Sequence, residues 1–147
     1  MMKLSEPIAG EIRNPSSERH FMTLHKLDGQ ASVRVGERIL ARSDDVLVVC
    51  DDFALDLHRL RFRPKGSSGG QKGLGDIIRC VGSDEIPRLR IGIGKPPENW
   101  NIPDYVLSKF TEDDASEMRF TIRRAADSIA DWVEHGTQFC MNKYNGK

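Results

Sequence analysis

The sequence predicts an α/β fold, a single domain in which a mixed, mostly parallel sheet is flanked by helices. Strand-like and helix-like segments alternate along the chain, which is the pattern of this class. The run Val46–Cys50 is apolar throughout, as is typical of a central parallel strand buried on both faces. A chain of 147 residues with 38% apolar content suits one domain, so residues 1–147 are expected to share one core.

The N-terminal part is predicted to hold a hairpin and a short helix. The segment Ile8–Leu27 has turn-forming residues at Asn14–Ser17 and a strand-like stretch at His20–Leu24. Apolar residues spaced by four predict a helix over Gln30–Leu40. The Val46–Cys50 strand follows after a polar break.

The middle of the chain alternates between strands and one helix. Strict alternation over Arg59–Arg63 places Leu60 and Phe62 on one face of a strand and the arginines on the other. A helix then follows and ends at Gly82, with one face formed by Leu74, Ile77, Ile78 and Val81. The next strand is expected to turn Leu89, Ile91 and Ile93 inward.

The C-terminal part is predicted to be one loop and one long helix. Prolines mark Pro96–Pro103 as a loop. Thr111 precedes three acidic residues, which favours a helix start there, and Gly136 is expected to end that helix. Its buried stripe is predicted to be Met118, Ile122, Ala125, Ile129 and Trp132.

A glycine-rich loop between two arginine-bearing strands is the strongest functional signal. The loop Gly66–Gly73 opens a helix, and bare backbone N–H groups, a helix N-terminus and fixed cations together form an anion site. The formal net charge is zero, yet residues 58–97 carry nine basic and three acidic side chains. A basic face for a nucleic acid and an ordinary solvated face both fit this charge pattern. The basic residues are Arg59, Arg61, Arg63, Lys65, Lys72, Arg79, Arg88, Arg90 and Lys95.

The cysteine content and the hydropathy of the chain indicate which kinds of site and which cellular compartment to expect. Three widely spaced cysteines, with no Cys-x-x-Cys pair, predict neither a zinc site nor a disulfide framework, and we expect no metal or cofactor. Apolar runs stay well short of the roughly 20 residues that span a bilayer. The N-terminal residues lack the apolar core of a secretory signal. We therefore expect a cytoplasmic protein without membrane contact.

Five segments together resemble bacterial-type peptidyl-tRNA hydrolase, in the same order and spacing from about Gly10 onward. They are Asp44–Asp52, Gly66–Leu74, Pro87–Pro97, Asp104–Phe110 and Met141–Asn145. The resemblance implies a mixed sheet between helices and hydrolysis of the ester that joins a peptide to tRNA. In that family a histidine activates water, an aspartate orients the histidine, and asparagine amides position water and peptide.

The resemblance also implies roles for individual residues. Asp51 falls at the aspartate that orients the histidine, Lys26 at an active-site asparagine, and Gln71-Lys72 at a His-Asn pair. A lysine accepts no hydrogen bond, but its ammonium donates to an oxyanion or a phosphate. The family's first strand and its Thr-Arg-His-Asn motif are expected to be missing, which leaves His20 as a substitute base.

The RNA side of the site is implied in the same way. Arg63 and Arg90 fall on positions that the family uses around the tRNA 5′-phosphate. The remaining predicted tRNA-binding residues are Arg61, Lys65, Gly69, Gly70 and Lys95.

Three functions follow for testing. The first is peptidyl-tRNA hydrolysis, weakened by the absent histidine motif. The second is a non-catalytic tRNA- or ribosome-binding module. The third, a nucleotide-binding domain, is disfavoured because both glycine fingerprints of such domains are absent. A missing strand would also expose Val48, Ile91 and Ile93, so self-association through a sheet edge is expected.

Overall fold

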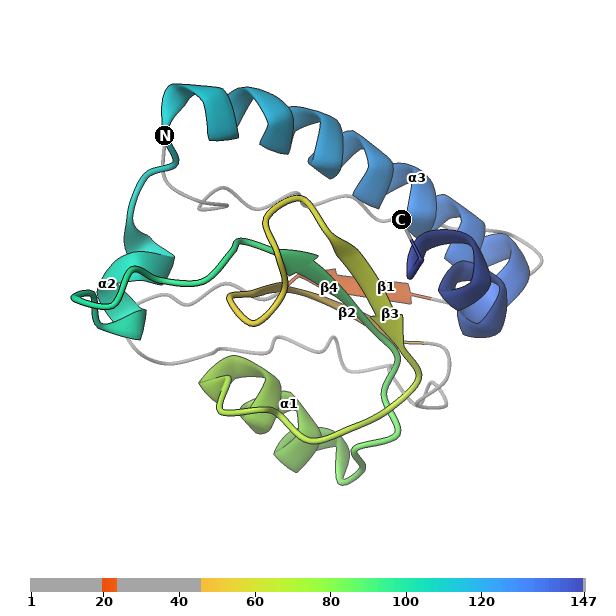
Figure 1. The fold of residues 1–147 in the computed structure, drawn as a ribbon. Helices are drawn as coiled ribbons and strands as arrows, with labels where there is room; N and C mark the ends of the chain where they lie inside the picture. Colours follow the sequence, from red (N-terminus) through yellow and green to blue (C-terminus); the bar gives the residue numbers. More distant parts are fainter. Residues whose placement is uncertain (1–19, 24–45, 147) are drawn as a thin grey trace.

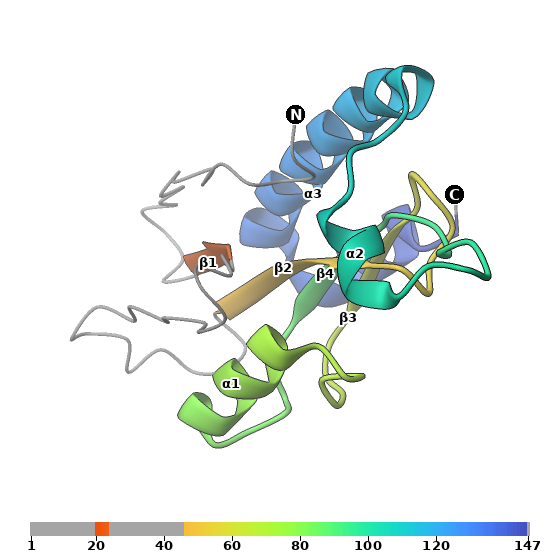
Figure 2. The same cartoon turned by 90° about the vertical axis from the view of Figure 1, so that its left-hand side faces the viewer.

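The structure is a computed structural model, and it describes residues 20–23 and 46–146 (Figure 1). The segments 1–19, 24–45 and the final residue lie outside the described residues. The predicted 30–40 helix, Lys26 and most of the predicted hairpin therefore lie outside as well. Within the described part, a sheet lies between α3 on one face and α1 on the other (Figures 1 and 2).

The sheet is mixed and mostly parallel, as predicted. Its strands are β1 (His20–Thr23), β2 (Val46–Asp52), β3 (Leu60–Arg63) and β4 (Arg88–Gly92), in the order β1-β2-β4-β3. β2 is parallel to both β1 and β4, and only β3 runs antiparallel to its neighbour β4. β2 is therefore a central strand, which explains its continuous apolar run.

Two of the three helices begin or end where the sequence predicts. α1 (Lys72–Val81) ends at Gly82, whose φ of 75° is the left-handed geometry that glycine adopts readily. α3 (Glu112–Tyr144) begins after Thr111, whose hydroxyl accepts a hydrogen bond of 3.1 Å from the Asp114 N–H.

The third helix and a helical segment after Gly136 are the parts of the helical structure that the sequence did not predict. α2 (Ile102–Leu107) lies partly within the predicted loop, because Pro103 occupies its first turn, where a missing N–H costs nothing. Gly136, with φ 81° and ψ −179°, ends the long regular helical segment, as predicted, and a second helical segment follows it within the range of α3. The chain resumes helical geometry after this break and continues to Tyr144.

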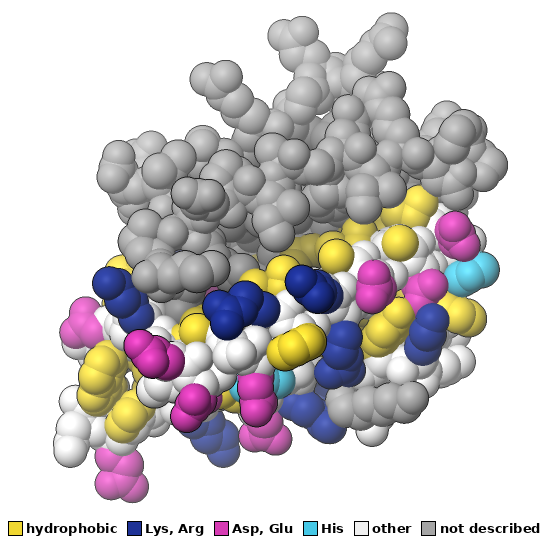
Figure 3. All heavy atoms as spheres, turned by 90° about the horizontal axis from the view of Figure 1, so that it is seen from above, with side chains coloured by type: hydrophobic (Ala, Val, Ile, Leu, Met, Phe, Trp, Pro, Cys, Tyr) yellow, Lys and Arg dark blue, Asp and Glu magenta, His cyan; other side chains and the backbone are white. Residues whose placement is uncertain are grey.

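α3 packs on one face of strands β2, β3 and β4 with apolar contacts. The predicted stripe of α3 is confirmed, since Met118, Ala125 and Trp132 are buried while Ile122 and Ile129 pack at its margin. From the sheet, the same cluster receives Leu47, Leu60, Phe62, Leu89 and Ile91. The outer surface of α3 instead interleaves acidic and basic side chains, as expected for a solvated helix (Figure 3).

α1 covers only part of the opposite face. Leu74 and Ile77 pack there on Val46, Val48 and Ile86. Val81, predicted on the same buried face, is 44% exposed because it lies in the last turn of α1. The expected exposure of Val48, Ile91 and Ile93 is wrong, since all three are buried.

Candidate functional site

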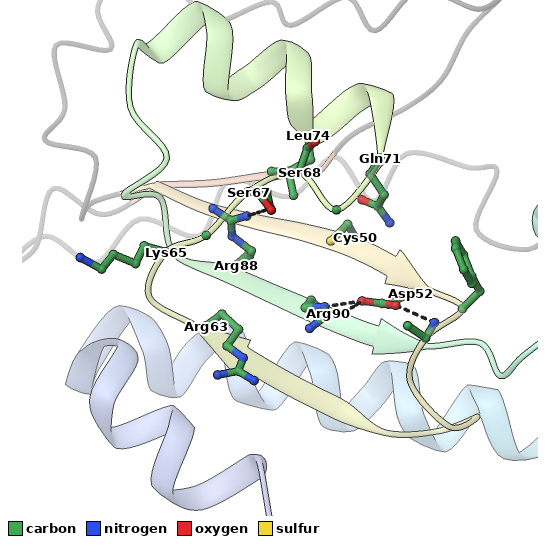
Figure 4. A pocket seen from close by; sticks show the side chains of 14 residues that line it. Cys50, Asp52, Arg63, Lys65, Ser67, Ser68, Gln71, Leu74, Arg88 and Arg90 are labelled. Carbon is green, nitrogen blue, oxygen red and sulfur yellow. Dashed lines mark hydrogen bonds and ion pairs between the residues drawn. The ribbon is translucent and has the colours of Figure 1, made fainter.

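A cleft of about 350 Å³ opens on the α1 side of the sheet, beyond the part that α1 covers (Figure 4). Strands β2, β3 and β4 form its floor, and the glycine-rich loop before α1 forms its wall. The lining residues are Cys50, Asp52, Phe53, Ala54, Arg63, Lys65, Gly66, Ser67, Ser68, Gly69, Gln71, Leu74, Arg88 and Arg90.

Strand alternation explains why this end of the sheet is polar. On β2, Val46 and Val48 lie under α1, whereas Cys50 and Asp52 share their face but extend past the helix. On β4, the alternation that buries Leu89 and Ile91 against α3 directs Arg88 and Arg90 to the cleft. The same sheet face is thus apolar at one end and charged at the other.

Arg88 forms a buried, positively charged part of the cleft floor. Its side chain is 3% exposed, and its guanidinium donates to three main-chain carbonyls: Ile86 at 3.2 Å, Ser67 at 3.0 Å and Asp84 at 3.1 Å. Burial lowers the pKa of Arg88, but an arginine stays protonated at neutral pH. Arg88 therefore ties the glycine-rich loop to the segment before β4 without a carboxylate bonded to it.

Arg90 differs from Arg88 because it has an acidic partner. Its guanidinium bonds the Asp52 carboxylate through two nitrogens, and Asp52 also accepts a bond of 2.7 Å from the Ala54 N–H. Asp52 is nearly buried, with 9% exposed. The prediction that nearby acids are too scarce to pair the arginines is therefore wrong for Arg90, whose partner comes from β2, its neighbour in the sheet.

The other predicted cations of the cleft are more accessible. Arg63 is exposed at the end of β3 and forms no ion pair within the described part of the chain. Lys65 lies 3.0 Å from Glu85, and this bond raises the pKa of Lys65. Arg61 sits opposite Arg90 in the β3–β4 pair but does not line the cleft, nor does the exposed Lys95.

The glycine-rich loop adopts left-handed backbone conformations at several of its glycines. Gly66, Gly69 and Gly70 have φ values of 144°, 58° and 84°, and a Cβ on any of them would meet nothing within 4 Å. These glycines therefore serve backbone conformation and not close packing. Gln71 is the N-cap of α1, and no acidic side chain occupies the first turn, so the positive end of this helix is uncompensated locally.

The predicted catalytic residues are only partly brought together. The Gln71 amide lines the cleft and donates to the main-chain oxygen of Asp51. By alternation the Asp51 side chain belongs to the α3 face of β2, with Leu47 and Val49, and it does not line the cleft. Lys72 is exposed at the first position of α1 and is not part of the lining.

His20 lies at the far end of the sheet from Asp51. Its Cα pairs with Val46 at the start of β2, five residues before Asp51. At about 3.3 Å per residue, this register separates the two backbones by roughly 16 Å, well beyond hydrogen-bond reach. The register therefore does not bring His20 beside Asp51, and the role of His20 as a base stays a prediction.

Several of the lining residues were not assigned to the site from the sequence. Asp52 lines the cleft but was not among the predicted site residues, and strand alternation separates its side chain from that of Asp51. Arg88 lies two residues before Arg90 on the same strand, so the two side chains share a face. This spacing could have predicted Arg88 as a cleft residue. Cys50 also lines the cleft; burial, with Asp51 and Asp52 nearby, raises the pKa of its thiol to about 12.

Two further searches of the described residues bear on function. No group of three or more His, Cys, Asp or Glu side chains there could hold a metal ion. None of the described helices is long and apolar enough to cross a membrane.

Comparison with known proteins identifies the family. The family model described as peptidyl-tRNA hydrolase matches residues 19–147. The chain belongs to the peptidyl-tRNA hydrolase family. The peptidyl-tRNA hydrolase of Rhodopirellula baltica is 50% identical over 102 residues, which cover 69% of this chain and 54% of that protein. That of Lachnospira eligens is 37% identical over 125 residues, covering 85% and 67% respectively.

Solved structures agree with the family. The crystal structure of peptidyl-tRNA hydrolase from Acinetobacter baumannii superposes with a TM-score of 0.62 at 28% identity. The match covers 69% of this chain and 52% of that one. This chain thus spans about half the length of the R. baltica and A. baumannii proteins and two thirds of the L. eligens protein.

Proposed function

We propose that this chain binds tRNA through the cleft and acts in the hydrolysis of peptidyl-tRNA. The observation that carries the proposal is the cationic cleft itself, in which a glycine-rich loop faces arginines on two neighbouring strands. Family membership supplies the substrate class, because the relatives are named for peptidyl-tRNA. The chemistry of the cleft supplies the mode of binding.

The balance of charges in the cleft favours a phosphate ligand. Asp52 is the one carboxylate among the lining residues, and Arg90 neutralises it. Arg63 and Arg88 then leave a positive excess, and a guanidinium matches a phosphate with two parallel N–H donors. Contacts of this kind hold RNA in register without reading its bases, and they weaken as salt rises.

Hydrolysis requires more than phosphate binding. Ester cleavage needs a base to activate water and a donor for the developing oxyanion. The Gln71 amide and the Lys72 ammonium are donors, and Asp51 remains the proposed orienting carboxylate. Asp52 is a poor base because it is already bonded to Arg90 and to a backbone N–H. We therefore assign binding and orientation to the cleft lining, and proton abstraction to a group outside it.

This division keeps a non-catalytic tRNA-binding module as the second candidate. The observation that favours it is that Arg90 and the Ala54 N–H both engage the Asp52 carboxylate. Contact with the ribosome, self-association and a cytoplasmic location stay predictions.

The test measures binding and turnover on the same preparation. We expect salt-sensitive tRNA binding, with peptidyl-tRNA turnover about 10²- to 10⁴-fold below that of the R. baltica relative, the usual contribution of general-base assistance. Turnover equal to that of the relative would instead establish a complete enzyme. Absence of salt-sensitive tRNA binding would contradict the proposal altogether.

A further inference from the structure

The outer edge of β3 is a place where the sheet needs an additional partner. β3 is the last strand in the order β1-β2-β4-β3, so only one of its edges pairs with another strand among the described residues. The backbone groups on the other edge must find hydrogen bonds elsewhere, because an open edge invites pairing with another chain.

The side chain of Asn145 supplies that partner. Its Oδ1 accepts a bond of 2.7 Å from the Phe62 N–H, and its Nδ2 donates a bond of 3.0 Å to the Phe62 carbonyl. One carboxamide therefore satisfies the donor and the acceptor of a single residue, as a neighbouring strand would. The two residues are 83 positions apart in the sequence, so this is a tertiary contact.

The break in α3 brings Asn145 to this position. After Gly136, the last part of α3 returns toward the end of β3 (Figure 1). Asp131 fixes the returning segment, since its carboxylate accepts bonds from the Lys143 ammonium at 2.7 Å and the Tyr144 hydroxyl at 2.5 Å. The Tyr144 ring also packs against Phe62, with centroids 6.0 Å apart.

We propose that Asn145 is a positioning residue for Arg63. Phe62 immediately precedes Arg63, and β3 has only four residues, so a clamp on both backbone groups of Phe62 fixes the point from which Arg63 enters the cleft. The role in RNA binding rests on the proposed function. The clamp on β3 does not, and the two are measured separately.

Amide hydrogen exchange tests the clamp. Asn145→Ala removes both bonds, and we expect exchange at the Phe62 amide to accelerate roughly tenfold, with buried amides of β2 unchanged. Asn142→Ala is the matched control, because Asn142 is exposed near the same helix end and its side chain, among the described residues, bonds to Gln138. An unchanged Phe62 rate, or an equal acceleration throughout the sheet, would overturn the clamp.

A double-mutant cycle tests the link to Arg63. Asn145→Ala should weaken tRNA affinity about three- to tenfold, Arg63→Gln somewhat more, and the double variant no more than Arg63→Gln alone. Fully additive losses would mean that Asn145 does not act through Arg63. If the wild-type chain shows no salt-dependent tRNA binding, the proposed function and the positioning role both fail. Exchange at Phe62 then still decides whether Asn145 closes the edge.

Discussion

The two faces of the sheet are built from the same strands but differ in what they present: one is apolar under α3, and the other is partly charged beside α1. Toward α3, strands β2, β3 and β4 present mainly apolar side chains, and residues along the length of α3 pack on them. Toward α1, a helix of 10 residues covers only the part that carries Val46 and Val48. The part that α1 leaves uncovered presents arginines and the carboxylate of Asp52, which Arg90 neutralises. The glycine-rich loop lines it.

The comparison shows that helix length, and not strand sequence alone, decides where a site forms. Strand alternation sends Phe62 to one face and Arg63 to the other. A charged side chain is tolerated on the α1 face only because α1 stops short of it. We therefore expect substitutions toward α3 to affect stability, and exposed substitutions toward the cleft to affect binding.

The largest effect is expected in the core beneath α3. Trp132 is fully buried, and its Nε1 donates to the Thr137 hydroxyl at 2.9 Å. Trp132→Ala should lower the free energy of unfolding by about 3–5 kcal/mol in urea denaturation, or prevent folding at 37 °C. Phe120→Ala is the matched control, since Phe120 lies on the same helix and is 65% exposed. Its loss should stay within about 0.5 kcal/mol. Equal losses of unfolding free energy in the two variants would contradict the claim that the face toward α3 carries the stability of the fold.

An intermediate effect is expected at the buried cation of the cleft. Arg88→Met keeps much of the side-chain volume but removes the donor to the Ile86 and Ser67 carbonyls, while the Asp84 carbonyl keeps its bond from the Gly66 N–H; this should cost about 1–3 kcal/mol of stability. Arg63→Gln should leave stability within about 0.5 kcal/mol, because Arg63 is exposed. Urea denaturation of both variants checks this. A destabilisation by Arg63→Gln as large as that of Arg88→Met would blur the distinction between the two arginines.

A smaller, pH-dependent effect is expected at Cys50. The pKa of this thiol is raised from 9.0 to about 12 in the folded chain, so the unfolded chain ionises first as pH rises. The stability from this thiol is therefore complete well below pH 9 and is lost as pH rises through 9, by about 1–2 kcal/mol at pH 10. The pKa values of Tyr105 and Tyr144 are raised as well, so Cys50→Ala isolates the thiol. Identical pH profiles of stability for wild type and Cys50→Ala would contradict the expected contribution of the Cys50 thiol.

Much of the fold could be predicted from local pattern. The apolar run of β2, the alternation of β3, the Thr111 cap and the Gly82 end are all signals within a few residues. The end of the regular helix at Gly136 is a further local signal, but the helical segment that follows it to Tyr144 was not predicted. Pro103 misled the prediction of α2, since proline is unfavourable inside a helix but well suited to its first turn.

The candidate site could be predicted only as a set of residues. The glycine-rich loop, Arg63 and Arg90 were placed correctly at one cleft. The pairing of Arg90 with Asp52 depends on which strands are neighbours, and β2 and β4 are joined through a loop, β3 and α1. Asn145 contacts Phe62 only because α3 bends back, which no local pattern reveals.

The most direct test of this account is a salt titration of tRNA affinity for wild type, Arg63→Gln and Arg79→Gln. Arg79 is exposed on α1, pairs with Asp76 and does not line the cleft, so its variant has the same charge change outside the site. We expect Arg63→Gln to flatten the slope of log affinity against log salt by about 0.7–0.9, one phosphate contact, while Arg79→Gln leaves it unchanged. Equal slopes for all three proteins would contradict the claim that the uncovered face of the sheet binds RNA phosphate.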